Sequence, residues 1–176
     1  LSTGGFSYPL TGSTGDGHRM AKDIGHTVTD IKPSLVPLEC HEGFCSKLAG
    51  LSLKNVKLSV FEEGKEKPVY SELGEMLFTH FGISGPLVLS ASAHIRDLDK
   101  KKYCAVVDLK PALDITQLDK RILRDFSQMQ NKDFLNALSQ LLPKSLISTV
   151  VSLSHIPPDT KVNQISKQQR AQLIEV

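Results

Sequence analysis

The hydrophobic pattern of this chain changes its period near Pro111, and this change limits the folds open to it. Before Pro111, apolar and polar residues alternate over Val56–Phe61 and Pro68–Leu73, with a polar turn at 62–67 between them. Alternation with period two is typical of strands, so the two runs predict a β-hairpin. Shorter apolar runs predict further strands at 51–53, 76–78 and 103–109. Short strands with little intervening helix indicate a small antiparallel barrel or sandwich.

Beyond Pro111, apolar residues recur every three or four positions, which is the spacing of one face of an α-helix. Pro143 separates two of these runs, and Ser166 followed by Gln169 predicts a capping box that opens a last helix. The sequence therefore predicts an α+β fold, with a small antiparallel β-barrel-like subdomain over 33–111 followed by a helical subdomain over 112–176.

The first seventeen residues hold five glycines and lead into a predicted helix over 15–24. Such a density of glycine lets the backbone adopt positive φ and approach a ligand closely. Thr14 or Asp16 at the helix mouth is expected to cap its free N–H groups, and these groups suit a phosphate, a pyrophosphate or an electron-rich heterocycle. The alternative is a glycine-rich turn that only links two elements.

The spacing of these glycines excludes two familiar nucleotide-binding loops. A P-loop needs Lys followed by Ser or Thr after its last glycine, whereas His18-Arg19 follows Gly17. A Rossmann fingerprint has the order Gly-x-Gly-x-x-Gly after a strand, and here the order over 12–17 is inverted. Gly25 is a natural residue to end the helix, and 27–29 predicts a short strand after it.

The strongest catalytic candidate outside the amino end is His80, which precedes a turn containing Ser84-Gly85-Pro86. An imidazole titrates near neutrality and can donate a proton to a cofactor or substrate anion. The alternative is that His80 hydrogen-bonds a neighbouring backbone group and holds the turn. Proline suits the first position of a helix, so Pro86 and the apolar run after it predict a buried helix.

Three cysteines in a chain without secretory features argue against a disulfide framework. Cys40, His41 and Cys45 offer thiolate and imidazole ligands within one loop, and thiolate with imidazole is a common ligand set for zinc. No second ligand pair has a suitable spacing, so we expect no metal and favour a polar turn with one buried thiol. Cys104 lies in an apolar strand and is expected in the core.

The composition is that of an ordinary globular domain, with 176 residues, 40% hydrophobic residues and a formal net charge of +2. The basic runs at 100–102 and 167–170 are short and lack interleaved aromatics, so no nucleic-acid partner is expected. No apolar run approaches the roughly 18 residues that span a bilayer, and no signal peptide opens the chain. We therefore expect a cytoplasmic protein with no membrane association.

The motifs, taken in order, resemble those of bacterial FAD-dependent oxidoreductases of the BaiN/YhiN type, the aminoacetone-oxidase-like flavoproteins. The first block comprises Ser2-Thr3-Gly4-Gly5, Ser7-Tyr8-Pro9, Thr11 to His18, Ala21 and Gly25-His26. Later landmarks of the same family are similar to the segments at 33–38, 74–86 and 108–111. The Thr14–Gly17 helix start is also similar to one in the fumarate-reductase type of flavoprotein, which is a broader match.

This resemblance implies an internal fragment of such an enzyme. Residues 1–32 would be a flavin-contacting segment and helix of the FAD domain, and 33–176 would be the insert that interrupts that domain. The family's amino-terminal Gly-x-Gly-x-x-Gly unit and its last glycine-rich flavin segment are not in this sequence. We therefore expect the fragment to be inactive alone, and its partner to be the flanking FAD-binding domain of the same protein.

The resemblance also implies a substrate-covering role, with FAD as cofactor, a small-molecule substrate and NAD(P)H as one candidate electron donor. His80 is then the candidate catalytic residue. A different class of function stays open, namely a non-enzymatic binding or assembly module whose glycine-rich end is only a linker. The cofactor contacts expected in the oxidoreductase are Thr3, Gly4, Gly5, Ser7, Tyr8, Thr14, Gly15 and Asp16.

Overall fold

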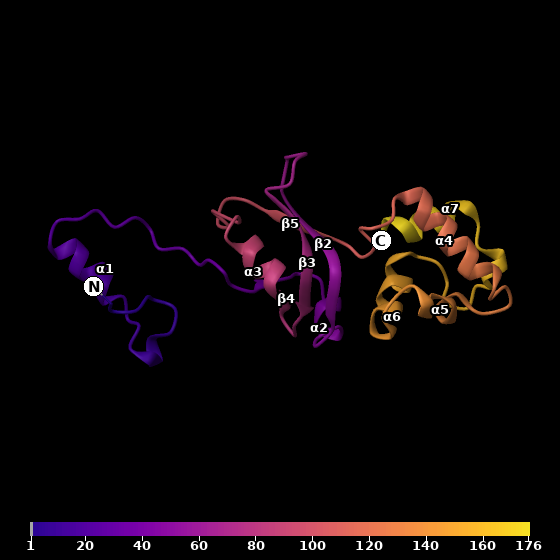
Figure 1. The fold of residues 1–176 in the computed structure, drawn as a ribbon, viewed down its shortest axis with the longest axis horizontal. Helices are drawn as coiled ribbons and strands as arrows, with labels where there is room; N and C mark the ends of the chain where they lie inside the picture. Colours follow the sequence, from indigo (N-terminus) through magenta and orange to yellow (C-terminus); the bar gives the residue numbers. More distant parts are fainter. Residues whose placement is uncertain (1) are drawn as a thin grey trace. The chain divides into compact units, whose positions relative to one another are not determined.

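The computed structural model describes residues 2–176 and shows two compact units, Leu1–Pro33 and Ser34–Val176 (Figure 1). The first unit contains a 3-10 turn, η1 (Pro9–Thr11), and helix α1 (Asp16–Asp23). Each unit is described by itself.

Helix α1 ends as the sequence predicts. Gly25 has a φ of +93°, and its N–H donates to the Lys22 carbonyl at 2.9 Å. The N–H of His26 donates to the Ala21 carbonyl at 2.9 Å, which completes a Schellman motif. The strand predicted at 27–29 is wrong, because the described residues 2–33 contain no strand with which it could pair.

Residues 2–33, the described part of the first unit, form no hydrophobic core of their own. Gly15 is the one buried residue among the described residues 2–33. Large apolar side chains of this unit are exposed instead, namely Phe6, Tyr8, Leu10, Met20, Ile24 and Ile31. The described residues of the first unit therefore bury few of their apolar side chains among themselves.

The second unit begins with a five-stranded antiparallel sheet in the order β1-β4-β3-β2-β5. Strands β2 and β3 form the predicted hairpin, in which Val60 pairs with Tyr70. Both are longer than predicted, since β2 continues through a bulge between Leu53 and Val56. The strands are β1 (Leu38–Glu39), β2 (Ser52–Glu62), β3 (Tyr70–Phe78), β4 (Gly82–Ser84) and β5 (Tyr103–Asp108).

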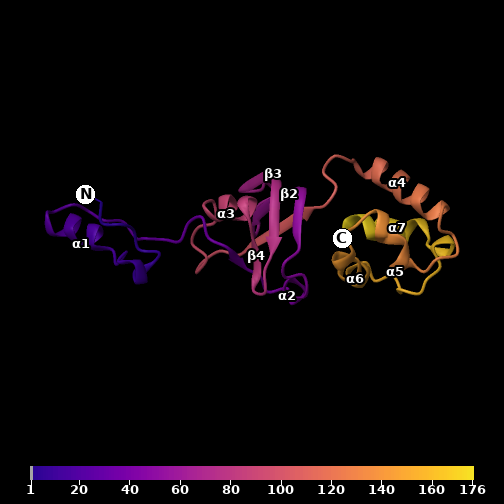
Figure 2. The ribbon, with the colours of Figure 1, turned by 60° about the horizontal axis from the view of Figure 1, so that its bottom comes forward.

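Helix α3 (Pro86–Ser92) packs on one face of this sheet, against β3 (Figure 2). It confirms the predicted buried helix, with Gly85 as N-cap and Pro86 in the first turn. Gly74 in β3 lets the helix approach, since a Cβ there would lie 3.0 Å from Leu87 Cγ. The face of the sheet on which α3 packs includes the buried side chains of Leu58, Val60 and Met76.

The opposite face of β5 is exposed, and the prediction that Cys104 lies in the core is wrong. Cys104 pairs with Phe61, whereas the buried Val60 pairs with Ala105. Because successive side chains alternate across a strand, Cys104 lies on the face opposite to the buried one. An apolar run alone does not distinguish the two faces of an edge strand.

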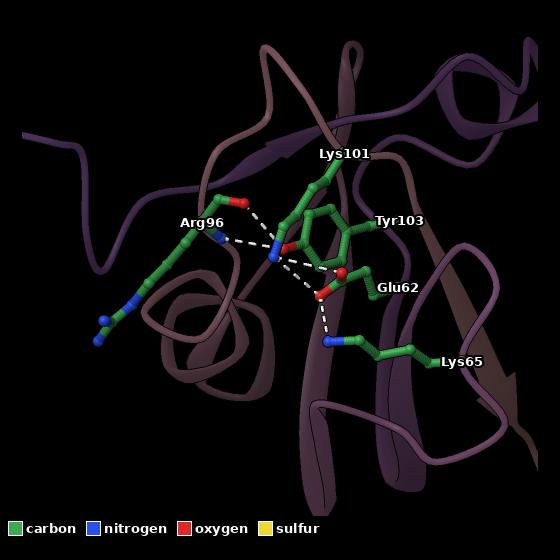
Figure 3. Close-up of polar contacts among 5 residues, drawn as sticks. All are labelled: Glu62, Lys65, Arg96, Lys101 and Tyr103. Atoms are coloured by element: carbon green, nitrogen blue, oxygen red, sulfur yellow. Dashed lines mark hydrogen bonds and ion pairs between the residues drawn. The ribbon is translucent and has the colours of Figure 1, made fainter.

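A polar cluster holds the end of β2 and the loop before β5 together (Figure 3). Glu62 accepts a hydrogen bond from Lys65 Nζ at 2.9 Å and pairs with Lys101 at 3.2 Å. The Tyr103 hydroxyl donates to the Arg96 carbonyl at 2.8 Å. The Lys65 hydrogen bond, aided by Lys101, holds the pKa of Glu62 below its usual range.

Replacing Glu62 with Gln is expected to lower the melting temperature at about pH 7, where the native carboxylate is ionised. A depressed pKa in the folded protein means that the stabilisation is present above the unfolded pKa and is lost as the pH falls through the folded pKa. Thermal unfolding at about pH 7 and about pH 3 should therefore show the two proteins converging in acid. Glu63→Gln is the control, because Glu63 makes no ion pair with the described residues; an equal loss in both variants would contradict the assignment.

The second unit ends in a helical region, as predicted. Its longest helix, α4 (Ile115–Ser127), starts at a capping box between Asp114 and Gln117, and α7 (Lys167–Glu175) starts at the predicted box between Ser166 and Gln169. Arg170 Nε donates to Asp119 Oδ1 at 2.9 Å and joins α7 to α4. The remaining elements are α5 (Phe134–Ala137), η2 (Leu138–Gln140), α6 (Lys144–Leu153) and η3 (Val162–Gln164).

Candidate functional site

The glycines of the first unit bring two stretches of backbone together. The N–H of Gly15 donates to the Gly5 carbonyl at 3.3 Å. A Cβ at Gly15 would lie 2.5 Å from Phe6 Cδ2, and one at Gly4 would lie 2.7 Å from Ser13 Oγ. Gly4 and Gly15 also have positive φ values of +72° and +79°. The positive φ values favour glycine at both positions, and a side chain at Gly15 or Gly4 would displace the Phe6 ring or the Ser13 hydroxyl.

No side chain caps α1, so the expectation of a cap from Thr14 or Asp16 is wrong. Gly15 takes the N-cap position in a left-handed conformation, which places Asp16 inside the first turn. Thr14 Oγ1 donates to Asp16 Oδ1 at 3.2 Å, and Asp16 forms an ion pair with Arg19. Of the first N–H groups of α1, those of Gly15 and His18 already donate to the Gly5 and Gly15 carbonyls, which leaves the Asp16 and Gly17 N–H groups available to a ligand.

A cleft of about 280 Å³ lies beside α1. Three basic side chains of the helix line it, namely His18, Arg19 and Lys22, and Asp30 is the one acidic residue in its lining. Arg19 is already held by its ion pair with Asp16 and by a 3.0 Å hydrogen bond from Nη1 to the Thr14 carbonyl. Lys22 therefore offers the cationic group most accessible to an anion, and His18 lines the cleft beside it.

Sequence reasoning missed His18 and Lys22 as candidates. They are four residues apart on α1, so they share one face of the helix, and this spacing was the signal that could have found them. Phe6, which also lines the cleft, was missed as well.

The predicted cofactor contacts divide into two groups. Gly4, Gly5 and Gly15 come together, with Thr3 next to Gly4, and Gly15 lines the cleft. Ser7, Tyr8, Thr14 and Asp16 are not in the lining of the cleft; Tyr8 is 73% exposed and precedes the η1 turn. Their roles as cofactor contacts stay predictions.

His80 lies exposed at the end of β3, and its ring packs edge-on against Phe81 with centroids 4.9 Å apart. The turn after β3 is closed by the preceding residue, Thr79. Its Oγ1 accepts a hydrogen bond from the Gly82 N–H at 3.1 Å, and its own N–H donates to the Gly82 carbonyl at 2.8 Å. Within residues 2–176, the His80 imidazole makes no hydrogen bond, so it is accessible to a ligand.

The corner after His80 depends on close contacts between backbones. A Cβ at Gly82 would lie 2.2 Å from the Leu38 carbonyl oxygen, so a side chain there would push β1 away from β4. Gly85 has a φ of +95°, and a Cβ there would lie 3.0 Å from Met76 Cα. These glycines hold the sheet and α3 together and fix the position of the His80 turn.

Replacing Gly82 with Ala is expected to destabilise the chain by about 1–3 kcal/mol, because overpacking a buried backbone contact forces the strands to shift. The matched control is Gly43→Ala, since Gly43 has no heavy atom within 4 Å of its Cβ position and a φ of −62°. Denaturant unfolding should show a change within about 0.5 kcal/mol for the control. Equal unfolding midpoints for the two variants would contradict the contact described at Gly82.

Within the described residues, no group of three or more His, Cys, Asp or Glu side chains is placed to hold a metal ion. None of the helices formed by residues 2–176 has the length and apolar character needed to cross a membrane.

Comparison with known proteins identifies the family. The model of the "HI0933-like protein barrel and H2TH domain" matches residues 32–176. The chain belongs to this family. The match confirms the flavoprotein oxidoreductase family inferred from the motifs, and the HI0933-like domain has the α+β architecture predicted, a curled antiparallel sheet followed by a helical region.

The chain is also similar to curated proteins over 99% of its length. It is 28% identical to the 3-dehydro-bile acid delta(4,6)-reductase of Clostridium scindens and 29% identical to the ribosomal RNA dihydrouridine synthase of Escherichia coli. The ribosomal RNA dihydrouridine synthase of Haemophilus influenzae is 30% identical. The chain spans only 40–42% of the length of these relatives.

Proposed function

We propose that this chain is a segment of an FAD-dependent oxidoreductase, in which residues 1–32 contact the flavin and residues 33–176 cover the substrate. The observation that carries the proposal is the first unit, whose described residues have a closely packed glycine loop and an uncapped helix but no core. Its exposed apolar side chains would be buried by the flanking FAD-binding domain of the same protein. The division of the insert into a barrel-like part over 33–111 and a helical part over 112–176 belongs to the same proposal.

The chemical groups that the first unit presents suit the FAD cofactor. Gly4 and Gly15 have positive φ and lie against the Ser13 and Phe6 side chains, and the free Asp16 and Gly17 N–H groups at the start of α1 favour a negative charge. Lys22 adds positive charge and His18 a hydrogen-bonding imidazole in the lining of the cleft, and the exposed rings of Phe6 and Tyr8 offer apolar contact. When bound, FAD supplies the two-electron transfer chemistry. The chain's own groups bind and orient it and exclude water.

The names of the relatives divide between a bile acid and ribosomal RNA. We favour a small-molecule substrate, with NAD(P)H as electron donor, because the basic runs of the helical region are short and four of its eight basic side chains are already bound to aspartates. Arg121 and Arg124 pair with Asp125, Lys161 pairs with Asp133 and Arg170 pairs with Asp119. A surface that binds RNA needs unpaired cations along the phosphate backbone.

Exchanging Gly15 for Ala in the full-length protein is expected to lower the flavin content, because the new Cβ would displace the Phe6 ring from the loop. Gly12→Ala is the matched control. Gly12 also has a positive φ, of +86°, but its Cβ position has no neighbour within 4 Å, so this variant carries only the backbone strain of about 1 kcal/mol. The ratio of flavin to protein absorbance measures the difference. Equal, undiminished ratios in both variants would favour the alternative in which the loop is only a linker of a non-enzymatic module.

His80 is proposed as a proton donor to the substrate, since its imidazole is exposed and Thr79 already closes the turn. His80→Gln is expected to lower turnover of the full-length enzyme by about 10²-fold with little change in melting temperature. Thr79→Val should instead lower the melting temperature and leave turnover of the folded enzyme nearly unchanged. The buried Gly82 N–H loses its acceptor in this variant, at a cost of about 1–3 kcal/mol. Single-turnover kinetics and thermal unfolding of both variants separate the two roles. Wild-type turnover in His80→Gln would remove the catalytic assignment.

A further inference from the structure

The two edges of the sheet differ in how they are protected. At one edge, β1 has only two residues, and the short helix α2 (Phe44–Lys47), which holds the buried Cys45, contacts the neighbouring strand β4. Short edge strands and covering helices are common ways to keep a further strand from pairing. At the other edge, β5 has six residues, and among residues 2–176 it pairs with β2 alone. Its segment 103–107 contains neither a charged residue nor a proline and runs in unbroken register, so this edge is open to another strand.

The register of β5 with β2 shows which backbone groups face the open edge. The Glu63 N–H donates to the Lys102 carbonyl at 2.9 Å, and these two residues continue the register of the two strands. Hydrogen-bonded and non-hydrogen-bonded residue pairs alternate along an antiparallel ladder, so every second residue from Lys102 onward bonds to β2. Tyr103, Ala105 and Val107 therefore direct their N–H and C=O groups to the open edge, where no described residue bonds to them.

The side chains on the outer face of this edge are apolar in the middle and charged at both ends. Val106 is 49% exposed, and Cys104 is exposed beside it. Lys102 precedes β5 and Asp108 ends it, and both are exposed. Because alternate residues of a strand share a face, these four side chains lie on the same side of the sheet. Neither Lys102 nor Asp108 forms an ion pair with another described residue, so both charges are available to a partner.

We propose that the open edge of β5 binds a second copy of this chain, with the two β5 strands antiparallel about a twofold axis at Ala105. In this register Tyr103 faces Val107 of the second copy and Ala105 faces its own counterpart, so all the outward backbone groups of β5 find partners. Lys102 then lies directly opposite Asp108 of the second copy, once on each side of the axis, and opposite charges at such positions stabilise the pairing. A register shifted by two residues would leave one outward residue of each strand facing a residue beyond β5.

Disulfide trapping in the full-length protein tests this register. Val106 would lie opposite Cys104 of the second copy in a non-hydrogen-bonded pair, whose Cα atoms are about 4.5 Å apart and thus within reach of a disulfide. Mild oxidation of Val106→Cys is expected to give a covalent dimer on a nonreducing gel, and peptide mass spectrometry should find the introduced cysteine linked to Cys104. Leu73→Cys is the matched control, because Leu73 is 66% exposed but lies on β3, which β2 separates from the open edge. This control should give no covalent dimer.

Charge reversal at the same edge gives an independent measure. Lys102→Glu places a like charge opposite Asp108 on both sides of the axis, so the dimer dissociation constant from analytical ultracentrifugation should rise at least about tenfold. Adding Asp108→Lys to the same chain should restore association, and an unchanged melting temperature of Lys102→Glu shows that its fold is retained. A full-length protein that is monomeric at every concentration would overturn the proposal, and protection of the β5 amides in that monomer would assign the edge to the flanking FAD-binding domain. A dimer that Lys102→Glu leaves intact, or that Val106→Cys fails to trap, would overturn it equally.

Discussion

The sheet of the second unit depends on a close approach of backbones at Gly82 and Gly85. At Gly82 the strand β4 touches β1, and at Gly85 the start of α3 touches β3. No other amino acid fits at either contact without moving one of these elements. The position of the His80 turn, the packing of α3 and the location of Cys40 all follow from this corner, because each is one or two residues from it or is bonded to it.

The first unit is built differently, since it exposes the apolar side chains that a domain normally buries. Its order rests on local features, such as the Schellman motif after α1 and the glycine contacts before it. Such local features contribute little to the stability of the unit without a core, because helices as short as α1 gain most of their stability from tertiary packing. A unit whose described residues form a glycine-rich loop and no core fits the proposal that it completes the FAD domain of a larger protein.

Features with local causes could be predicted from the sequence. The hairpin follows from alternation around a polar turn, the start of α3 from Gly85-Pro86, and the start of α7 from Ser166 and Gln169. The wrong predictions concern features that depend on partners distant in the sequence or on the backbone conformation of a single residue. The strand at 27–29 needed a neighbour, Cys104 was assigned to the wrong face, and the cap at Thr14 or Asp16 was pre-empted by the left-handed Gly15.

The most direct test of the account is hydrogen exchange of the α1 amides, compared between residues 1–176 alone and the full-length flavoprotein. Helix α1 is predicted to exchange freely in the isolated chain, even after FAD is added, because the chain alone is expected to hold FAD weakly and the described residues of its first unit form no core. In the full-length protein α1 should be protected, while β2 and α3 are protected in both. Equal protection of α1 in the isolated chain would contradict the claim that a flanking FAD-binding domain orders this unit.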